Sequence, residues 1–170
     1  MNLPNKIRIL EVGPRDGFQN LKTFIETKHK IEIIDALAGA GLQSIEATSF
    51  VNPKWVPQMA DAKEVCAYCA QRVDKTYELA VLVPNGKGVE NALAAGAEKI
   101  TMVISVSEAH NKANVNRTVE ESFQEFEKIV KTYPNGRFRL ALATVFGCPF
   151  GEEIRTERVT ELLKRAKDTG

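Results

Sequence analysis

Short apolar runs alternate along the chain with longer segments whose apolar residues recur every three or four positions. The short runs are rich in Ile, Val, Leu and Thr and have the length of buried strands. They predict strands at Ile7–Val12, Ser44–Ser49, Glu78–Val83, Ile100–Val106 and Arg139–Val145. The longer segments predict helices at Thr27–Ala40, Pro57–Gln71, Asn85–Ala95, Val119–Tyr133 and Thr156–Asp168. Repeated strand–helix units are typical of a parallel sheet in an α/β fold.

Residues at the ends of the predicted helices support these boundaries. Thr118 and Glu121 have the spacing of a capping box at the start of the fourth helix. Gly39–Gly41 and Gly96 lie just past helix ends, where glycine accepts a positive φ without strain. Each of these glycine positions therefore predicts a turn into the next strand.

Two architectures are built from right-handed strand–helix repeats, the doubly wound open sheet and the closed (β/α)8 TIM barrel. A doubly wound nucleotide-binding protein would carry Gly-x-Gly-x-x-Gly after its first strand. This chain has Gly13-Pro14-Arg15-Asp16-Gly17 there, so the barrel is favoured. A whole barrel takes about 250 residues, and about five of its eight units fit here. We therefore expect residues 1–170 to form a single domain, the N-terminal portion of a truncated TIM barrel.

Charge and composition narrow the possible partners. The 170 residues carry 23 basic and 22 acidic side chains, a net charge of +1, spread along the whole length. No one-signed field points to nucleic acid or to a membrane surface, so a small-molecule partner is expected. An odd set of three cysteines without a signal-like segment predicts a cytoplasmic protein.

In a barrel, the side chains that follow each strand converge on the active site. Asp16 offers a hard oxygen ligand for Mg²⁺ or Mn²⁺, and Arg15 offers a permanent cation for a developing enolate oxygen. A surface turn with a weak ion pair is an equally good interpretation of this dipeptide. Glu46 lies between apolar neighbours and needs a partner, which we expect to be Arg15. That contact is expected whether Glu46 is purely structural or orients the guanidinium.

Two long segments resemble the signatures of the hydroxymethylglutaryl-CoA lyases. They are Glu11–Asn20, which reads EVGPRDGFQN, and Glu46–Met59, which reads EATSFVNPKWVPQM. Val83–Asn85 and Gly147–Phe150 lie where such lyases have similar segments, so the resemblance extends over essentially the whole chain.

The resemblance implies a divalent-metal enzyme that cleaves 3-hydroxy-3-methylglutaryl-CoA, or a close 3-hydroxyacyl-CoA, to acetyl-CoA and acetoacetate. It implies Asp16 as a ligand of Mg²⁺ or Mn²⁺, and Arg15 as the catalytic cation near the substrate carbonyl. Glu46 would belong to the catalytic site around Arg15, and Gln19 and Ser49 would contact the substrate. A homodimer is the expected assembly.

Other parts of the family's machinery are missing from this sequence. The family has a His-x-His pair, an Asn and a catalytic Cys later in the chain. The two histidines present, His29 and His110, are far apart and do not form that pair. Because Mg²⁺ needs several positioned oxygen ligands, the isolated 170-residue chain is predicted to be inactive.

Several residues outside the signatures are open to more than one interpretation. Cys66 and Cys69 resemble a redox or zinc pair, but they lie mid-helix and have no second pair, which favours a structural role. Cys148 is expected to be a structural thiol, with a nucleophile as the alternative. His110 follows the fourth predicted strand and faintly resembles a substrate-binding His of related Claisen-type synthases. Trp55 is expected to anchor a loop by packing on the barrel rim.

Departures from the signatures leave other functions open. Phe18, Leu21 and Gly151–Glu153 differ from the residues that these lyases usually have. A Claisen-type acyl-CoA synthase or carboxyltransferase on the same barrel is the nearest alternative. A non-catalytic half-barrel that self-associates is an alternative of a different class, because its unclosed strands would need covering.

Overall fold

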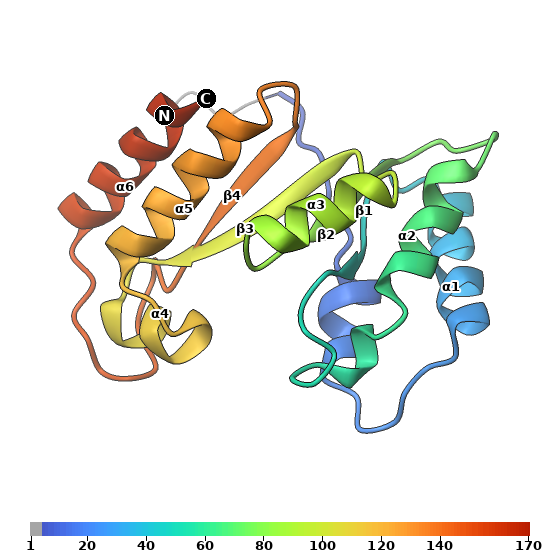
Figure 1. Ribbon diagram of the computed structural model, residues 1–170, viewed down its shortest axis with the longest axis horizontal. Helices are drawn as coiled ribbons and strands as arrows, with labels where there is room; N and C mark the ends of the chain where they lie inside the picture. Colours follow the sequence, from blue (N-terminus) through green and yellow to red (C-terminus); the bar gives the residue numbers. More distant parts are fainter. Residues whose placement is uncertain (1–4) are drawn as a thin grey trace. The chain divides into compact units, whose positions relative to one another are not determined.

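The computed structural model describes residues 5–170 and has an α/β fold built around one sheet (Figure 1). The strand order is β1-β2-β3-β4, with bounds Ser44–Ser49, Glu78–Leu82, Lys99–Ser105 and Phe138–Ala143. The α-helices α1 to α6 span Thr27–Gly39, Ala62–Gln71, Gly86–Ala94, Glu108–Val115, Val119–Thr132 and Thr156–Thr169. A π-helical turn, η1, spans Gly13–Gly17, and a 3-10 turn, η2, spans Pro57–Met59. The predicted α/β class is confirmed.

The described chain divides into two compact units. Unit one comprises residues 5–83 and 87–100, and unit two comprises residues 84–86 and 101–170. Strand β3 begins in unit one and continues in unit two. The two units are described separately below.

Unit one has its core between the β1–β2 pair and the helices α1 and α2. The two strands are parallel, with Ser44 opposite Glu78 and a register shift between Glu46 and Thr48. All six residues of β1 are buried, as a strand covered on both faces requires. Cys66 and Cys69 of α2 are both fully buried and belong to this core.

Burial also determines the chemistry of these two thiols. Loss of solvent raises the pKa of Cys66 to about 12, and burial likewise raises the pKa of Cys69. A thiol with so high a pKa stays protonated at neutral pH and is a poor nucleophile. The CxxC spacing places both thiols on the buried face of α2.

Unit two packs α5 and α6 side by side (Figure 1). Phe123, Phe126 and Ile129 of α5 and Leu162 of α6 are buried. The Arg165 guanidinium of α6 lies 4.9 Å from the centre of the Phe123 ring, over its face. The same guanidinium pairs with two carboxylates of α5, Glu120 and Glu127. Burial of apolar side chains and ion pairs together hold the two helices.

The predicted capping box at the start of α5 is confirmed. Thr118 Oγ1 accepts the N–H of Glu121 at 3.1 Å, and Glu121 Oε2 accepts the N–H of Thr118 at 2.8 Å. Glycine positions past helix ends also match the prediction, since Gly41 has φ +88° and Gly96 has φ +87°. Local signals of this kind act within a few residues, so they can be found from sequence alone.

The prediction of a strand at Ile7–Val12 is wrong. Only Glu11 makes a bridge, to Ile45, through hydrogen bonds of 2.9 and 2.8 Å to the residues on either side of Ile45. Ile7 is 80% exposed and Ile9 is 61% exposed. A period-2 apolar pattern identifies residues that could be buried, whereas a strand also needs backbone partners along its length.

Two further predictions are corrected by the turns around the helices. The segment predicted as one helix from Pro57 to Gln71 is broken into η2 and α2. Helix α4 was not predicted, because it is short and carries only a weak apolar periodicity. It is fixed at its start by Ser107, whose hydroxyl accepts the N–H of His110. No helix within residues 5–170 is long and apolar enough to cross a bilayer.

An ion pair holds the start of β2 in unit one. Lys75 pairs with Glu98, and Glu98 Oε2 also accepts the backbone N–H of Leu79 at 3.0 Å. Burial raises the pKa of Glu98, but these two hydrogen bonds outweigh that effect and hold it below its usual range. The folded state therefore favours the ionised carboxylate more than the unfolded chain does.

We expect Glu98→Gln to lower the free energy of unfolding at neutral pH and to have little effect in acid. Because the folded pKa of Glu98 is depressed, its stabilisation is present above the unfolded value and is lost as the pH falls through the folded value. Urea titrations of both proteins should converge between about pH 5 and about pH 3. A difference that stays constant over that range would contradict this account.

Candidate functional site

The η1 turn places two charged side chains directly after the Glu11 bridge. The N–H groups of Arg15 and Asp16 both bond to the carbonyl of Val12, at 3.0 and 2.7 Å. The N–H of Phe18 bonds to the carbonyl of Gly13, five residues earlier, which is the spacing of a π-helical turn. The N–H of Gly13 donates to Glu11 Oε1 at 2.6 Å. A Cβ at position 13 would lie 2.9 Å from that oxygen, so glycine allows this close approach. Single π turns of this kind are frequent at functional sites.

Arg15 is held between two carboxylates. Its Nε donates to Glu46 Oε1 at 2.6 Å, and its Nη1 donates to Asp16 Oδ1 at 2.5 Å. Glu46 is fully buried in the middle of β1, where an unpaired carboxylate would be costly. The predicted contact between Arg15 and Glu46 is confirmed. The guanidinium thus has one edge anchored in the core of unit one, and the Arg15 side chain is only 15% exposed.

Asp16 is the accessible member of this group. Its side chain is 56% exposed, and its backbone carbonyl accepts the side-chain N–H of Asn20 at 2.7 Å. A carboxylate in this position fits as one ligand of a hard divalent ion. Within residues 5–170, however, no three His, Cys, Asp or Glu side chains come together in a way that could hold a metal. The described part of the chain therefore does not gather a full set of such ligands around Asp16.

Ser49 ends β1 on the strand that carries Glu46. Its hydroxyl is fully buried and has no hydrogen-bond partner within the described part of the chain. A buried hydroxyl without a partner costs about 1–3 kcal/mol, so a bound molecule that supplied one would be favoured. Gln19 follows η1 and is half-buried. The structure thus places Arg15, Asp16, Glu46, Ser49 and Gln19 all in unit one.

Sequence reasoning missed a buried ion pair next to these segments. Lys30 of α1 is only 3% exposed at its side chain, and its Nζ donates to Asp61 Oδ1 at 2.6 Å and to the carbonyl of Gln58 at 2.5 Å. The ammonium also lies 4.3 Å from the centre of the Phe24 ring. The available signal was helical spacing, since Lys30 is one turn before the buried Ile34. This pair ties α1 to the segment that follows β1.

A second polar cluster lies in unit two, after β3 and β4. Ser107 contacts Cys148 and Glu152, and His110 Nδ1 lies 2.7 Å from Ser105 Oγ. Its members come from separate segments of the chain, which is why sequence reasoning treated Cys148 and His110 individually. Their grouping depends on the fold of unit two.

Two other predictions on single residues have clear outcomes. His29 is exposed, as expected for a charged helix start. Trp55 is 85% exposed, so the prediction that it packs as a loop anchor is wrong. The physical reason is local, because the turn at Asn52 holds the backbone there without the indole. The N–H groups of Trp55 and Val56 both bond to the carbonyl of Asn52.

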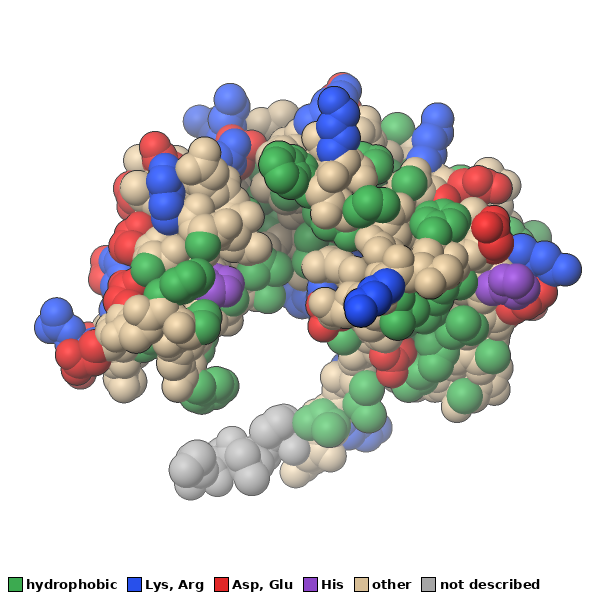
Figure 2. All heavy atoms as spheres, turned by 90° about the horizontal axis from the view of Figure 1, so that it is seen from below, with side chains coloured by type: hydrophobic (Ala, Val, Ile, Leu, Met, Phe, Trp, Pro, Cys, Tyr) green, Lys and Arg blue, Asp and Glu red, His purple; other side chains and the backbone are tan. Residues whose placement is uncertain are grey.

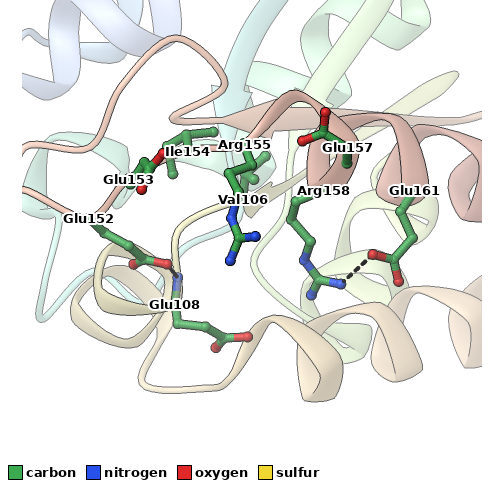
Figure 3. A pocket seen from close by; sticks show the side chains of 9 residues that line it. All are labelled: Val106, Glu108, Glu152, Glu153, Ile154, Arg155, Glu157, Arg158 and Glu161. Atoms are coloured by element: carbon green, nitrogen blue, oxygen red, sulfur yellow. Dashed lines mark hydrogen bonds and ion pairs between the residues drawn. The ribbon is translucent and has the colours of Figure 1, made fainter.

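A pocket of about 470 Å³ opens in unit two between the starts of α4 and α6 (Figure 3). Five carboxylates and two guanidinium groups line it with Val106 and Ile154, and they belong to Glu108, Glu152, Glu153, Glu157, Glu161, Arg155 and Arg158. Such an acidic lining disfavours a phosphate-bearing ligand. Elsewhere, acidic and basic side chains are interspersed on the face seen in Figure 2, in keeping with the balanced charge of the chain.

Charged side chains that follow the strands of a parallel sheet covered by helices lie where barrel enzymes have their active sites, and an accessible carboxylate among them suits a metal-assisted reaction. The comparisons with known proteins agree with this class. Residues 6–170 match the HMGL-like family model, and the chain belongs to the HMGL-like family.

Relatives and solved structures of this family match the whole chain. The mitochondrial hydroxymethylglutaryl-CoA lyase of Macaca fascicularis is 45% identical over 99% of this chain and 52% of the relative. The HMG-CoA lyase structure of Bacillus subtilis superimposes with a TM-score of 0.91 at 39% identity, covering 100% of this chain and 57% of that one. An Acinetobacter baumannii HMG-CoA lyase in complex with coenzyme A and 3-methylmalate gives a TM-score of 0.89 at 36% identity, over 96% and 53% of the two chains.

These likenesses confirm the predicted fold family. The chain has the fold of a partial TIM barrel with about four strands. It spans about half the length of the curated relatives that it matches.

Proposed function

We propose that the protein acts as a carbon–carbon lyase on 3-hydroxy-3-methylglutaryl-CoA or a close 3-hydroxyacyl-CoA. One observation carries this proposal, the Arg15 guanidinium fixed by the buried Glu46 beside the exposed Asp16. Membership of the HMGL-like family supports the reaction class. The coenzyme A complex of the Acinetobacter relative supports an acyl-CoA as the substrate class.

The chain's own residues suit the charge that develops in such a cleavage. When the carbon–carbon bond breaks, the acetyl-CoA fragment leaves as an enolate with negative charge on its oxygen. Arg15 is a permanent cation and can stabilise that oxygen, while Glu46 fixes the direction of its Nε edge. The Ser49 hydroxyl, which has no partner within residues 5–170, can donate to a substrate oxygen. Gln19 is the further proposed substrate contact.

A bound Mg²⁺ or Mn²⁺ would supply Lewis-acid polarisation of the substrate oxygens. Asp16 is the residue of this chain that would hold it, through a carboxylate that is already accessible. The His-x-His pair that the family resemblance implies is not found in these 170 residues, and no Asn can be matched to the one that follows that pair in the family. The proposed roles of Arg15, Glu46 and Ser49 therefore concern substrate charge and orientation alone.

The proposal also covers the partner, the assembly and the cellular location of the protein. We propose an acyl-CoA ester as its small-molecule partner, a homodimer as its assembly and the cytoplasm as its location. Support for the first comes from the coenzyme A complex of a relative. The other two extend the sequence-based predictions.

The test is an assay of the protein purified from its native gene, with Mg²⁺ or Mn²⁺ added. Release of acetoacetate and acetyl-CoA from 3-hydroxy-3-methylglutaryl-CoA is the expected result. Condensation of acetyl-CoA with a keto acid, without acetoacetate release, would overturn the lyase proposal in favour of a Claisen-type synthase. The isolated 170-residue chain is expected to show no turnover, because no three His, Cys, Asp or Glu side chains of its described part come together to hold a metal.

A further inference from the structure

A hydrogen-bond network in unit two centres on the hydroxyl of Ser107. Ser107 is fully buried directly after β3, and its Oγ accepts the backbone N–H of His110 at 2.9 Å. Glu152 Oε2 lies 2.7 Å from this Oγ, and Cys148 Sγ lies 3.0 Å from it. A serine hydroxyl has one proton and two lone pairs. A carboxylate and a sulfur atom therefore compete for a single proton.

While Glu152 is ionised, its carboxylate is the stronger acceptor for the Ser107 hydroxyl proton. Its carboxylate also accepts the backbone N–H groups of Ala109 at 3.0 Å and of Glu108 at 3.2 Å, so it is anchored at the start of α4 (Figure 3). The hydrogen bonds from Ser107 and Ala109 hold the pKa of Glu152 below its usual range. Charge-assisted bonds to a carboxylate are stronger than bonds to a neutral thiol.

The remaining geometry then determines what Cys148 can do. One lone pair of Ser107 Oγ accepts from His110, and the other is left for the S–H of Cys148. Partial burial raises the pKa of Cys148, while donation from Ser107 and from the N–H of Phe150, 3.3 Å from the sulfur, lowers it below its usual value. The contribution of Ser107 exists only when its proton points at sulfur.

We propose that Glu152 gates the nucleophilicity of Cys148 through the hydroxyl proton of Ser107. With the carboxylate in place, Ser107 donates to Glu152 and Cys148 donates to Ser107, so the sulfur stays a thiol. When the carboxylate is removed or displaced, the Ser107 hydroxyl turns to the sulfur and stabilises the thiolate, which reacts with soft electrophiles. This inference lies beyond the proposed lyase function and does not depend on it.

The test uses iodoacetamide as the electrophile and the 170-residue chain as it exists. The Cys148 thiolate forms a carbon–sulfur bond and displaces iodide, which leaves with the carbon–iodine electron pair, while the thiol proton passes to the buffer. Peptide mass spectrometry at pH 7 follows alkylation of each cysteine separately. Cys66 and Cys69 are fully buried and serve as internal controls, because they are alkylated only if the protein unfolds.

We expect Glu152→Ala to accelerate alkylation of Cys148 by about threefold to tenfold. Lowering a thiol pKa by one unit raises the thiolate fraction about tenfold, but the nucleophilicity falls in part, which leaves about threefold. In a Ser107→Ala background the same Glu152→Ala change should have a much smaller effect. No hydroxyl proton is left to redirect, and only the negative charge of Glu152, which raises the pKa of Cys148, is removed.

The double-mutant cycle separates this gate from simpler explanations. An acceleration by Glu152→Ala that is equally large in the Ser107→Ala background would overturn the proposal, because loss of negative charge or loop opening alone would then explain it. An unchanged rate in Glu152→Ala would overturn it as well. Ser107→Gly is the second hydroxyl-free variant, and it keeps most of the N-cap preference of α4 if Ser107→Ala fails to fold.

Discussion

Replacing Arg15 with methionine is expected to lower the kcat of the whole enzyme by about 10³-fold, with a smaller change in KM. The guanidinium stabilises charge that appears as the bond breaks, and loss of one such group typically costs about 10²–10³ in rate. Lys63→Met is the matched control, because Lys63 is an exposed cation on α2. Steady-state kinetics of acetoacetate release would measure both variants.

Glu46 provides the second arm of this test. It contacts the guanidinium from the protein core, so Glu46→Gln should reduce kcat by about 10–100-fold through misplacement of Arg15. Once Arg15 is methionine, Glu46→Gln should cost little more, because a positioning residue acts only through the group that it positions. An Arg15→Met enzyme that keeps more than a tenth of its kcat would remove Arg15 from the proposed mechanism.

Replacing Lys30 with methionine is expected to lower the free energy of unfolding by about 3–5 kcal/mol. The change leaves the carboxylate of Asp61 buried without its cation, while the Thr27 hydroxyl still donates to it at 2.8 Å. Urea unfolding of the 170-residue chain would measure the loss. Lys28→Met is the control on the same helix, since Lys28 is exposed and should change stability by less than about 0.5 kcal/mol.

The double variant Lys30→Met with Asp61→Leu separates the cost of an unpaired charge from the value of the pair. Replacing both partners of a buried ion pair by apolar side chains is often close to neutral. We expect the double variant to recover most of the stability that Lys30→Met loses. A double variant as unstable as the single one would mean that the ammonium contacts with Gln58 and Phe24 carry the stabilisation.

Several features were readable from sequence because they depend on short-range rules. The capping box of Thr118 and Glu121 needs residues three apart, and the glycine turns need a positive φ at one position. β1 was predicted with its correct bounds, because an apolar run with β-branched residues favours a buried strand. The partnership of Arg15 and Glu46 followed from the cost of burying a lone carboxylate.

Other features depended on contacts between distant segments. From the sequence alone, Lys30 would be taken as a surface residue. Its burial depends on contacts that its ammonium makes with Asp61, Gln58 and Phe24. The exposure of Ile7 shows the reverse error, since an apolar pattern does not reveal whether anything packs on it.

The sequence by itself determined the α/β class, most of the strand and helix positions, and the identity of the charged residues after the first strands. These are set by local propensity and by periodicity, which the chain carries along its length. Only the tertiary structure decided that Ser107 joins Cys148 to Glu152 and that Ser49 is buried without a partner within residues 5–170. Those relations rest on distances between side chains far apart in sequence, and folding alone brings such atoms within hydrogen-bond range.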